Sequence, residues 1–78
     1  MENKDKYDRA FQEIFDVSRE EVSKCSSQNT VNWTSINLMR LIVQLEKEFD
    51  IVFDYSAAAD FDSYETGKAV LKEYGISV

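Results

Sequence analysis

Apolar residues recur at helical spacing in three stretches of the chain. In the first stretch they fall at i, i+3, i+4, i+7 and i+8, which places them on one face of a helix. The apolar positions are Tyr7, Ala10, Phe11, Ile14 and Phe15, and the polar positions between them are Asp8, Arg9, Gln12, Glu13 and Asp16. The pattern predicts a helix from about residue 4 to residue 16 whose polar residues lie on the side away from the core.

The second stretch has the strongest helical pattern. Its apolar positions are Leu38, Leu41, Ile42, Leu45 and Phe49. We expect a helix from Ser35 to about Asp50 with this stripe facing the core. A shorter helical turn is expected at residues 55–60, followed by a last helix that ends at Gly75. The apolar positions of the last helix are Tyr64, Val70, Leu71 and Tyr74.

Two segments have the form of a capping box, in which a helix-capping residue is followed three positions later by Glu. Ser18 with Glu21 should start a short turn that carries Val22 inward. Asp62 with Glu65 should start the last helix.

Between the first two helices, residues 23–34 are rich in Ser, Asn and Thr, whose side chains compete with helix by bonding to nearby backbone. We expect a long ordered loop here, anchored by Val31 and Trp33. Loops of this length are uncommon in small domains and are often functional. The functional site is therefore expected at the end of this loop.

Together the elements predict an all-α fold, a small bundle of three main helices and one short helix. The length of 78 residues fits a single domain, residues 1–78, with one small core. The sequence contains no strand alternation, no internal repeat and no low-complexity segment. The expected core residues are Tyr7, Phe11, Ile14, Phe15, Leu38, Leu41, Ile42, Leu45, Phe49, Val70 and Leu71.

Charge and cysteine usage narrow the range of partners. Nine basic and fifteen acidic residues give a net charge of −6, which disfavours nucleic acid and anionic membranes as partners. Such charge favours basic patches on other proteins, although an acidic surface also serves solubility alone. A single cysteine, Cys25, and no histidine predict no internal disulfide and no metal site. We expect a soluble, unprocessed, cytoplasmic protein, since no signal peptide or membrane-spanning window is present.

A second apolar group lies on the long helix, nearly opposite its core stripe. Ile36, Met39 and Val43 cluster there when successive residues are turned by about 100°. An exposed group of this kind tends to mark a contact site, and the alternative is that another helix covers it. Ser35, beside this group, lies at or next to the helix N-cap, where free N–H groups favour an attached anion. The alternative for Ser35 is a capping role only, since Ser and Thr are common N-caps.

The stretch from Ser35 to Ile51 resembles the second helix of acyl carrier proteins. In that family the modified serine is followed by a hydrophobic residue and, fourteen residues on, by Phe-Asp-Ile, the spacing of Ser35 and Phe49 here. Val17-Ser-Arg-Glu-Glu-Val22 resembles the segment that closes the family's first helix, and Asp62-Ser-Tyr-Glu65 resembles the start of its last helix. The resemblance therefore covers nearly the whole chain.

The resemblance implies that Ser35 carries a covalent 4'-phosphopantetheine group. The family's Leu-Gly-x-Asp-Ser-Leu run reads Val31-Asn-Trp-Thr-Ser-Ile36 here, with Asn32 able to adopt the left-handed backbone of the usual Gly. Thr34 replaces the family's Asp, a carboxylate that the modifying transferase is expected to engage. Helix two of the family is acidic and meets basic partner enzymes. Here the expected partner-binding residues are Ile36, Met39, Arg40, Val43 and Lys47.

Two functional hypotheses remain open at this point. The first is a monomeric acyl or aminoacyl carrier in fatty acid, polyketide or nonribosomal peptide biosynthesis. Its partners would be a phosphopantetheinyl transferase and dedicated acyl- or aminoacyl-handling enzymes. The second is an unmodified carrier-like module that binds other proteins, which Thr34 favours. An enzymatic role is not expected, because the chain lacks histidine and its remaining groups form no recognisable triad.

Overall fold

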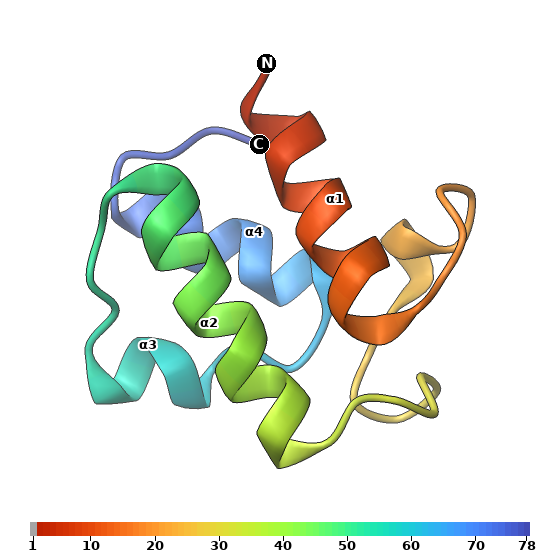
Figure 1. The fold of residues 1–78 in the computed structure, drawn as a ribbon. Helices are drawn as coiled ribbons and strands as arrows, with labels where there is room; N and C mark the ends of the chain where they lie inside the picture. Colours follow the sequence, from red (N-terminus) through yellow and green to blue (C-terminus); the bar gives the residue numbers. More distant parts are fainter. Residues whose placement is uncertain (1) are drawn as a thin grey trace.

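Four α-helices and one short 3₁₀ helix make up the fold of residues 2–78, the part of the chain that the computed structural model describes (Figure 1). The α-helices are α1 (Asn3–Phe15), α2 (Ser35–Phe49), α3 (Tyr55–Ala59) and α4 (Tyr64–Glu73), and the 3₁₀ helix η1 spans Val22–Lys24. Within residues 2–78 there is no strand, only an isolated bridge between Ser26 and Ser63. The prediction of an all-α bundle with three longer helices and one short helix is confirmed.

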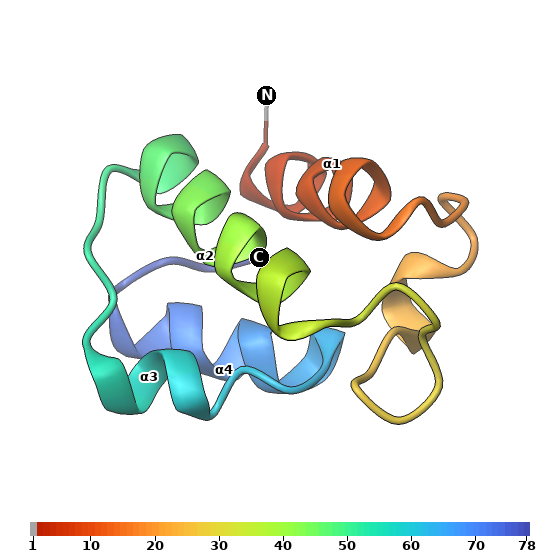
Figure 2. The same cartoon turned by 60° about the horizontal axis from the view of Figure 1, so that its bottom comes forward.

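The helices form two layers. Figure 2 shows α1 and α2 in one layer and α3 and α4 in the other. Helix α1 contacts α2 and η1, and α4 also contacts η1. Leu41, Ile42 and Leu45 on one face of α2 are buried, while Ile36 and Val43 on the opposite face are exposed.

The core between the layers is rich in aromatic side chains. Its buried members are Tyr7, Ala10, Phe11, Phe15, Val22, Cys25, Leu41, Ile42, Leu45, Phe53, Ala57, Phe61, Tyr64, Val70 and Leu71. Of the predicted core residues, Ile14, Leu38 and Phe49 are only partly buried and pack against its edge. Phe49 is the last residue of its helix, where fewer neighbours surround a side chain.

Two core phenylalanines lie outside the helices, where periodicity predicted nothing. Phe53 follows α2 and Phe61 joins α3 to α4, and both are buried. The Phe61 ring lies 6.2 Å from the Phe11 ring and 6.4 Å from the Tyr7 ring, centroid to centroid. The linkers therefore contribute to the core as well as connecting the helices.

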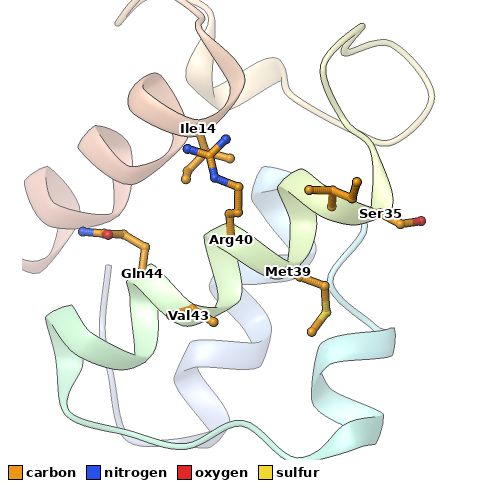
Figure 3. A pocket seen from close by; sticks show the side chains of 7 residues that line it. Ile14, Ser35, Met39, Arg40, Val43 and Gln44 are labelled. Atoms are coloured by element: carbon orange, nitrogen blue, oxygen red, sulfur yellow. The ribbon is translucent and has the colours of Figure 1, made fainter.

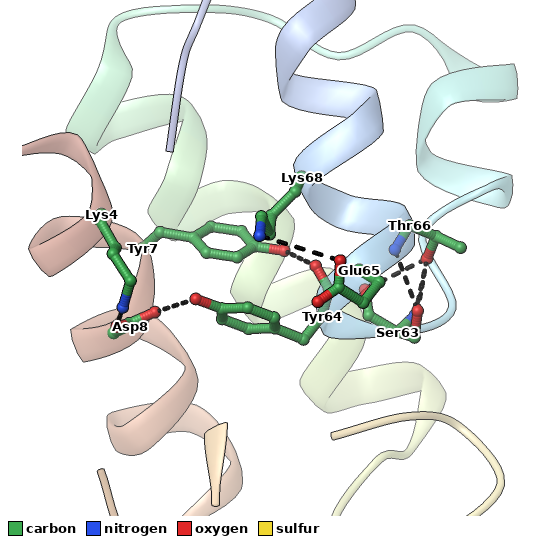
Figure 4. Close-up of polar contacts among 8 residues, drawn as sticks. All are labelled: Lys4, Tyr7, Asp8, Ser63, Tyr64, Glu65, Thr66 and Lys68. Carbon is green, nitrogen blue, oxygen red and sulfur yellow. Dashed lines mark hydrogen bonds and ion pairs between the residues drawn. The ribbon is translucent and has the colours of Figure 1, made fainter. Parts of the chain in front are cut away.

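A buried polar connection joins α1 to α4, and it overturns the prediction that Asp8 lies on the polar side of its helix (Figure 4). The Asp8 side chain accepts hydrogen bonds from the Tyr64 hydroxyl and from the Lys4 ammonium group, both at 2.6 Å. The Tyr7 hydroxyl donates to the Tyr64 backbone carbonyl at 2.7 Å. Burial, together with the neighbouring Asp8 carboxylate, raises the pKa of both tyrosines well above the ordinary value. Because its oxygens are satisfied, Asp8 can lie at this boundary despite its charge.

The long helices α1 and α2 end one residue earlier than predicted, at an aspartate with a left-handed backbone. Asp16 and Asp50 have φ values of 56° and 54°. Asp tolerates this conformation better than most residues, so it can end a helix where Gly is absent. Gly75 ends α4 as predicted, with φ of 82° and its N–H donating to the Lys72 carbonyl at 3.0 Å.

The capping box of α4 differs from the predicted one. Ser63 and Thr66 form it, and the predicted pair of Asp62 and Glu65 does not (Figure 4). The Ser63 hydroxyl accepts from the Thr66 N–H at 3.0 Å, and the Thr66 hydroxyl accepts from the Ser63 N–H at 2.8 Å. The threonine hydroxyl thus takes the place that Glu usually holds in this motif.

In the segment between α1 and η1, Ser18 and Glu21 are bonded to each other as predicted, but the short helix begins only at Val22. The Glu21 carboxylate accepts from the Ser18 N–H at 3.1 Å and from the Ser18 hydroxyl at 2.9 Å. These two bonds lower the pKa of Glu21, since they favour its charged form. Val22 is buried in η1, as predicted.

Candidate functional site

The loop before α2 is fixed to the start of α4. The Ser27 N–H donates to the Asp62 carbonyl at 2.8 Å, and the Tyr64 N–H donates to the Cys25 carbonyl at 2.9 Å. Because these bonds join residues far apart in the sequence, they hold the loop against the body of the fold. The predicted ordered loop is therefore present, with η1 occupying its first part.

Trp33 and Asn32 attach the end of this loop to α1. The Trp33 ring stacks on the Phe15 ring, with centroids 4.6 Å apart and planes inclined by 5°. The Asn32 side chain donates to the Phe15 carbonyl at 2.9 Å. The prediction of Trp33 as an anchor is confirmed, and Asn32 is an anchor that the pattern did not predict.

The prediction of Val31 as a second anchor is wrong. Val31 is 93% exposed, because a turn closed by the Trp33 N–H and the Thr30 carbonyl, 3.0 Å apart, places it at an outer corner. Asn32 has no left-handed backbone either: within residues 2–78, Asp16 and Asp50 are the only such residues besides glycine. Asn32 contributes through the hydrogen bond of its side chain and not through a left-handed backbone.

Ser35 is the first residue of α2, and Thr34 is its cap. The Thr34 hydroxyl accepts from the Asn37 N–H at 3.1 Å, and the Thr34 carbonyl accepts from the Leu38 N–H at 2.8 Å. Ser35 is exposed, and its hydroxyl makes no hydrogen bond to any residue of the described chain. Figure 3 shows its side chain at the end of α2, pointing away from Ile14.

The apolar group beside Ser35 is open to solvent. Ile36, Met39 and Val43 are 74%, 59% and 45% exposed, while Leu41 and Leu45 on the opposite face are fully buried. The alternative that another helix covers this group is wrong for the described chain. We call Ile36, Met39 and Val43 the apolar patch.

A shallow groove of about 600 Å³ runs between α1 and α2 beside the apolar patch (Figure 3). It is lined by Ile14, Ser35, Ile36, Met39, Arg40, Val43 and Gln44. Four of the five predicted partner-binding residues thus share one groove with Ser35, and Lys47 lies outside it. Gln44 was not predicted as a site residue. Its place four residues after Arg40 puts the two side chains next to each other on the helix, so the sequence could have indicated it. Ile14 was predicted as a core residue, and its partial exposure accounts for its place here.

The side chains around Ser35 include no group placed to act on it. Arg40 donates to the Asn37 side chain at 3.2 Å and is exposed. No group of three or more His, Cys, Asp or Glu residues that could hold a metal ion occurs in residues 2–78. The Cys25 thiol is buried, and its burial raises its pKa, so it is a poor nucleophile. The site therefore offers a free hydroxyl at a helix N-terminus, bordered by apolar side chains and one guanidinium group.

Comparisons with known proteins identified no relative of this chain. The chain matches no known protein-family model, and none of the curated proteins is similar to it. The helices of the described chain are all too short or too polar to cross a bilayer.

Proposed function

We propose that the chain is an acyl or aminoacyl carrier protein. In this proposal the Ser35 oxygen bears a 4'-phosphopantetheine arm, whose thiol holds an intermediate as a thioester. Partner enzymes carry out the chemistry, and the chain delivers the intermediate to them. The order of the helices, with a long loop leading to Ser35 at the start of α2, agrees with the resemblance to acyl carrier proteins.

The observation that carries the proposal is the separation of the cap from Ser35. Thr34 satisfies the Asn37 N–H, so the Ser35 hydroxyl has no part in starting the helix. An exposed hydroxyl without an internal partner is free for covalent attachment. The free N–H groups of the first turn and the helix dipole would stabilise a phosphodiester attached there.

The attachment itself exchanges one phosphate ester for another. The Ser35 oxygen attacks the pantetheine-bearing phosphorus of coenzyme A, and the bond from that phosphorus to the bridging oxygen of the pyrophosphate breaks. The serine proton is lost to a base of the transferase, and adenosine bisphosphate leaves. Ser35 keeps the phosphopantetheine as a diester, so no oxidant or reductant is needed.

The apolar patch supports delivery as well as attachment. It lies within the first turns of α2 on the exposed side, so an enzyme that contacts it also reaches Ser35. Tethering keeps the intermediate at high effective concentration near the docked enzyme.

A second function, an unmodified protein-binding module, is favoured by Thr34. The transferase of carrier proteins is expected to engage an Asp at this position, and threonine offers no carboxylate. The same groove and patch would then serve binding alone.

The two functions are separated by incubating the protein with coenzyme A, Mg²⁺ and a broad-specificity phosphopantetheinyl transferase. We expect the intact mass to rise by one phosphopantetheine, and Ser35→Ala to abolish the rise. Thr34→Asp should accelerate modification, since Asp also caps the helix and supplies the missing carboxylate.

One further variant serves as a control for the effect of the carboxylate. Thr34→Asn keeps a capping side chain without a charge, so any acceleration by Thr34→Asp beyond that of Thr34→Asn comes from the carboxylate. If neither the wild type nor Thr34→Asp is modified by several transferases, the carrier function falls and the unmodified module takes its place.

A further inference from the structure

The exposed face of α2 combines apolar and basic side chains along a single line. Ile36, Arg40, Val43 and Lys47 follow one another at i, i+4, i+7 and i+11, which places them on one side of the helix. All four are exposed. We call these four residues together with Met39 the docking face.

The two cations of this face are unpaired. The ion pairs of the described chain join Lys4 to Asp8 and Lys68 to Glu65, and neither involves the docking face. The residues three and four positions from Arg40 are Ile36, Asn37, Val43 and Gln44. Because none of them is acidic, α2 itself offers no carboxylate to this guanidinium group.

The acidic residues within α2, Glu46 and Glu48, lie at its other end, and both carboxylates are already hydrogen-bonded. The Glu46 carboxylate accepts from the Phe53 N–H at 2.9 Å, and the Glu48 carboxylate accepts from the Gln44 side chain at 3.1 Å. Asp50 follows the helix as its C-cap, and no ion pair joins it to Lys47 in the described chain. Arg40 is the only charged residue between positions 35 and 45, so the part of α2 nearest Ser35 is positive.

This positive charge contrasts with the rest of the molecule. The chain has a net charge of −6, so acidic residues dominate its surface. A net negative charge is enough to keep the chain in solution. Solubility therefore does not explain why two unpaired cations lie next to three exposed apolar side chains. Interfaces of this composition meet a partner of opposite charge, which steers the encounter and fixes the register.

We propose that the docking face binds a partner protein whose apolar pocket is bordered by Asp or Glu side chains. Ile36, Met39 and Val43 enter the pocket, while Arg40 and Lys47 pair with the acidic border. This polarity is the reverse of the one that the net charge and the resemblance to acyl carrier proteins favour. The inference rests on the proposed function only in taking α2 as the docking helix, and it does not require modification of Ser35.

The test is a nuclear magnetic resonance titration of the ¹⁵N-labelled full chain with two synthetic amphipathic peptides. Both peptides have the same leucine face, and they differ only in having Glu or Lys on the polar face. We expect the Glu peptide to shift the amide signals of the docking face and the Lys peptide to leave them unchanged. Since the unmodified chain is used, this outcome is independent of whether Ser35 can be modified.

Two double variants supply the matched comparison. Arg40→Glu with Lys47→Glu should weaken binding of the Glu peptide about tenfold, because two favourable charge pairs become repulsive. Lys24→Glu with Lys72→Glu changes the net charge equally at exposed sites elsewhere and should leave the affinity nearly unchanged.

Three results would overturn the inference. The first is binding of the Lys peptide to the docking face, and the second is no shift of these amides with either peptide. The third is a concentration-dependent shift of the same amides without peptide, since it would show that a second copy of the chain covers the face.

Discussion

Two neighbouring hydroxyl side chains have different roles at the start of α2. Thr34 accepts the Asn37 N–H and begins the helix, whereas Ser35 faces solvent without a partner. An anion attached to Ser35 gains from the helix dipole, and the cap remains in place because it belongs to the preceding residue. The proposed modification therefore requires no rearrangement of the helix start.

Gly67 is the residue at which the core tolerates no side chain. A Cβ atom at this position would overlap the Tyr7 hydroxyl and the Phe61 ring, and both of these side chains are fully or almost fully buried. Helix propensity alone favours Ala over Gly by about 1 kcal/mol. We expect the contacts to dominate, so that Gly67→Ala lowers the free energy of unfolding by about 1 to 3 kcal/mol in urea denaturation.

The steric cause of this loss can be tested separately. Combining Gly67→Ala with Phe61→Leu, which removes the nearest ring, should cost less than the sum of the two single changes. A Gly67→Ala protein as stable as the wild type would contradict the tight packing of α4 against α1.

At the scale of elements, periodicity predicted the helices well and their ends less well. The 3.6-residue repeat of α1 and α2 depends on local sequence, so it can be recognised without the fold. The ends depend on which polar side chain reaches a free N–H group or adopts a left-handed backbone. Sequence alone did not separate Ser63 and Thr66 from Asp62 and Glu65, since each pair has the right spacing.

Substitutions on the two faces of α2 should change the free energy of unfolding by very different amounts. Leu45 is fully buried, so Leu45→Ala should lower the free energy of unfolding by about 2 to 5 kcal/mol. Met39 is 59% exposed, so Met39→Glu should change it by less than about 0.5 kcal/mol while weakening partner transfer. Urea denaturation followed by circular dichroism measures the free energy of unfolding of both variants. Unfolding caused by Met39→Glu would mean that the apolar patch belongs to the core.

At the scale of the whole molecule, the features that the sequence did not predict depend on contacts between distant segments. The apolar patch could be predicted from the sequence because it lies on a helix with a clear period. Ser35 was singled out by its place at the start of that helix and by the resemblance to acyl carrier proteins. The groove required Ile14 of α1 to lie beside α2, which no local pattern specifies. Asp8 is buried for the same reason, since its partner Tyr64 comes from α4.

The proposed carrier function requires that Ser35 carries a phosphopantetheine arm. The most direct measurement is the intact mass of the protein purified from the cells that naturally produce it, followed by peptide fragmentation. We predict a mass increased by one phosphopantetheine, with or without a bound acyl or aminoacyl group, and fragments that assign it to Ser35. An unmodified mass, or a modification assigned to another residue, would contradict the claim.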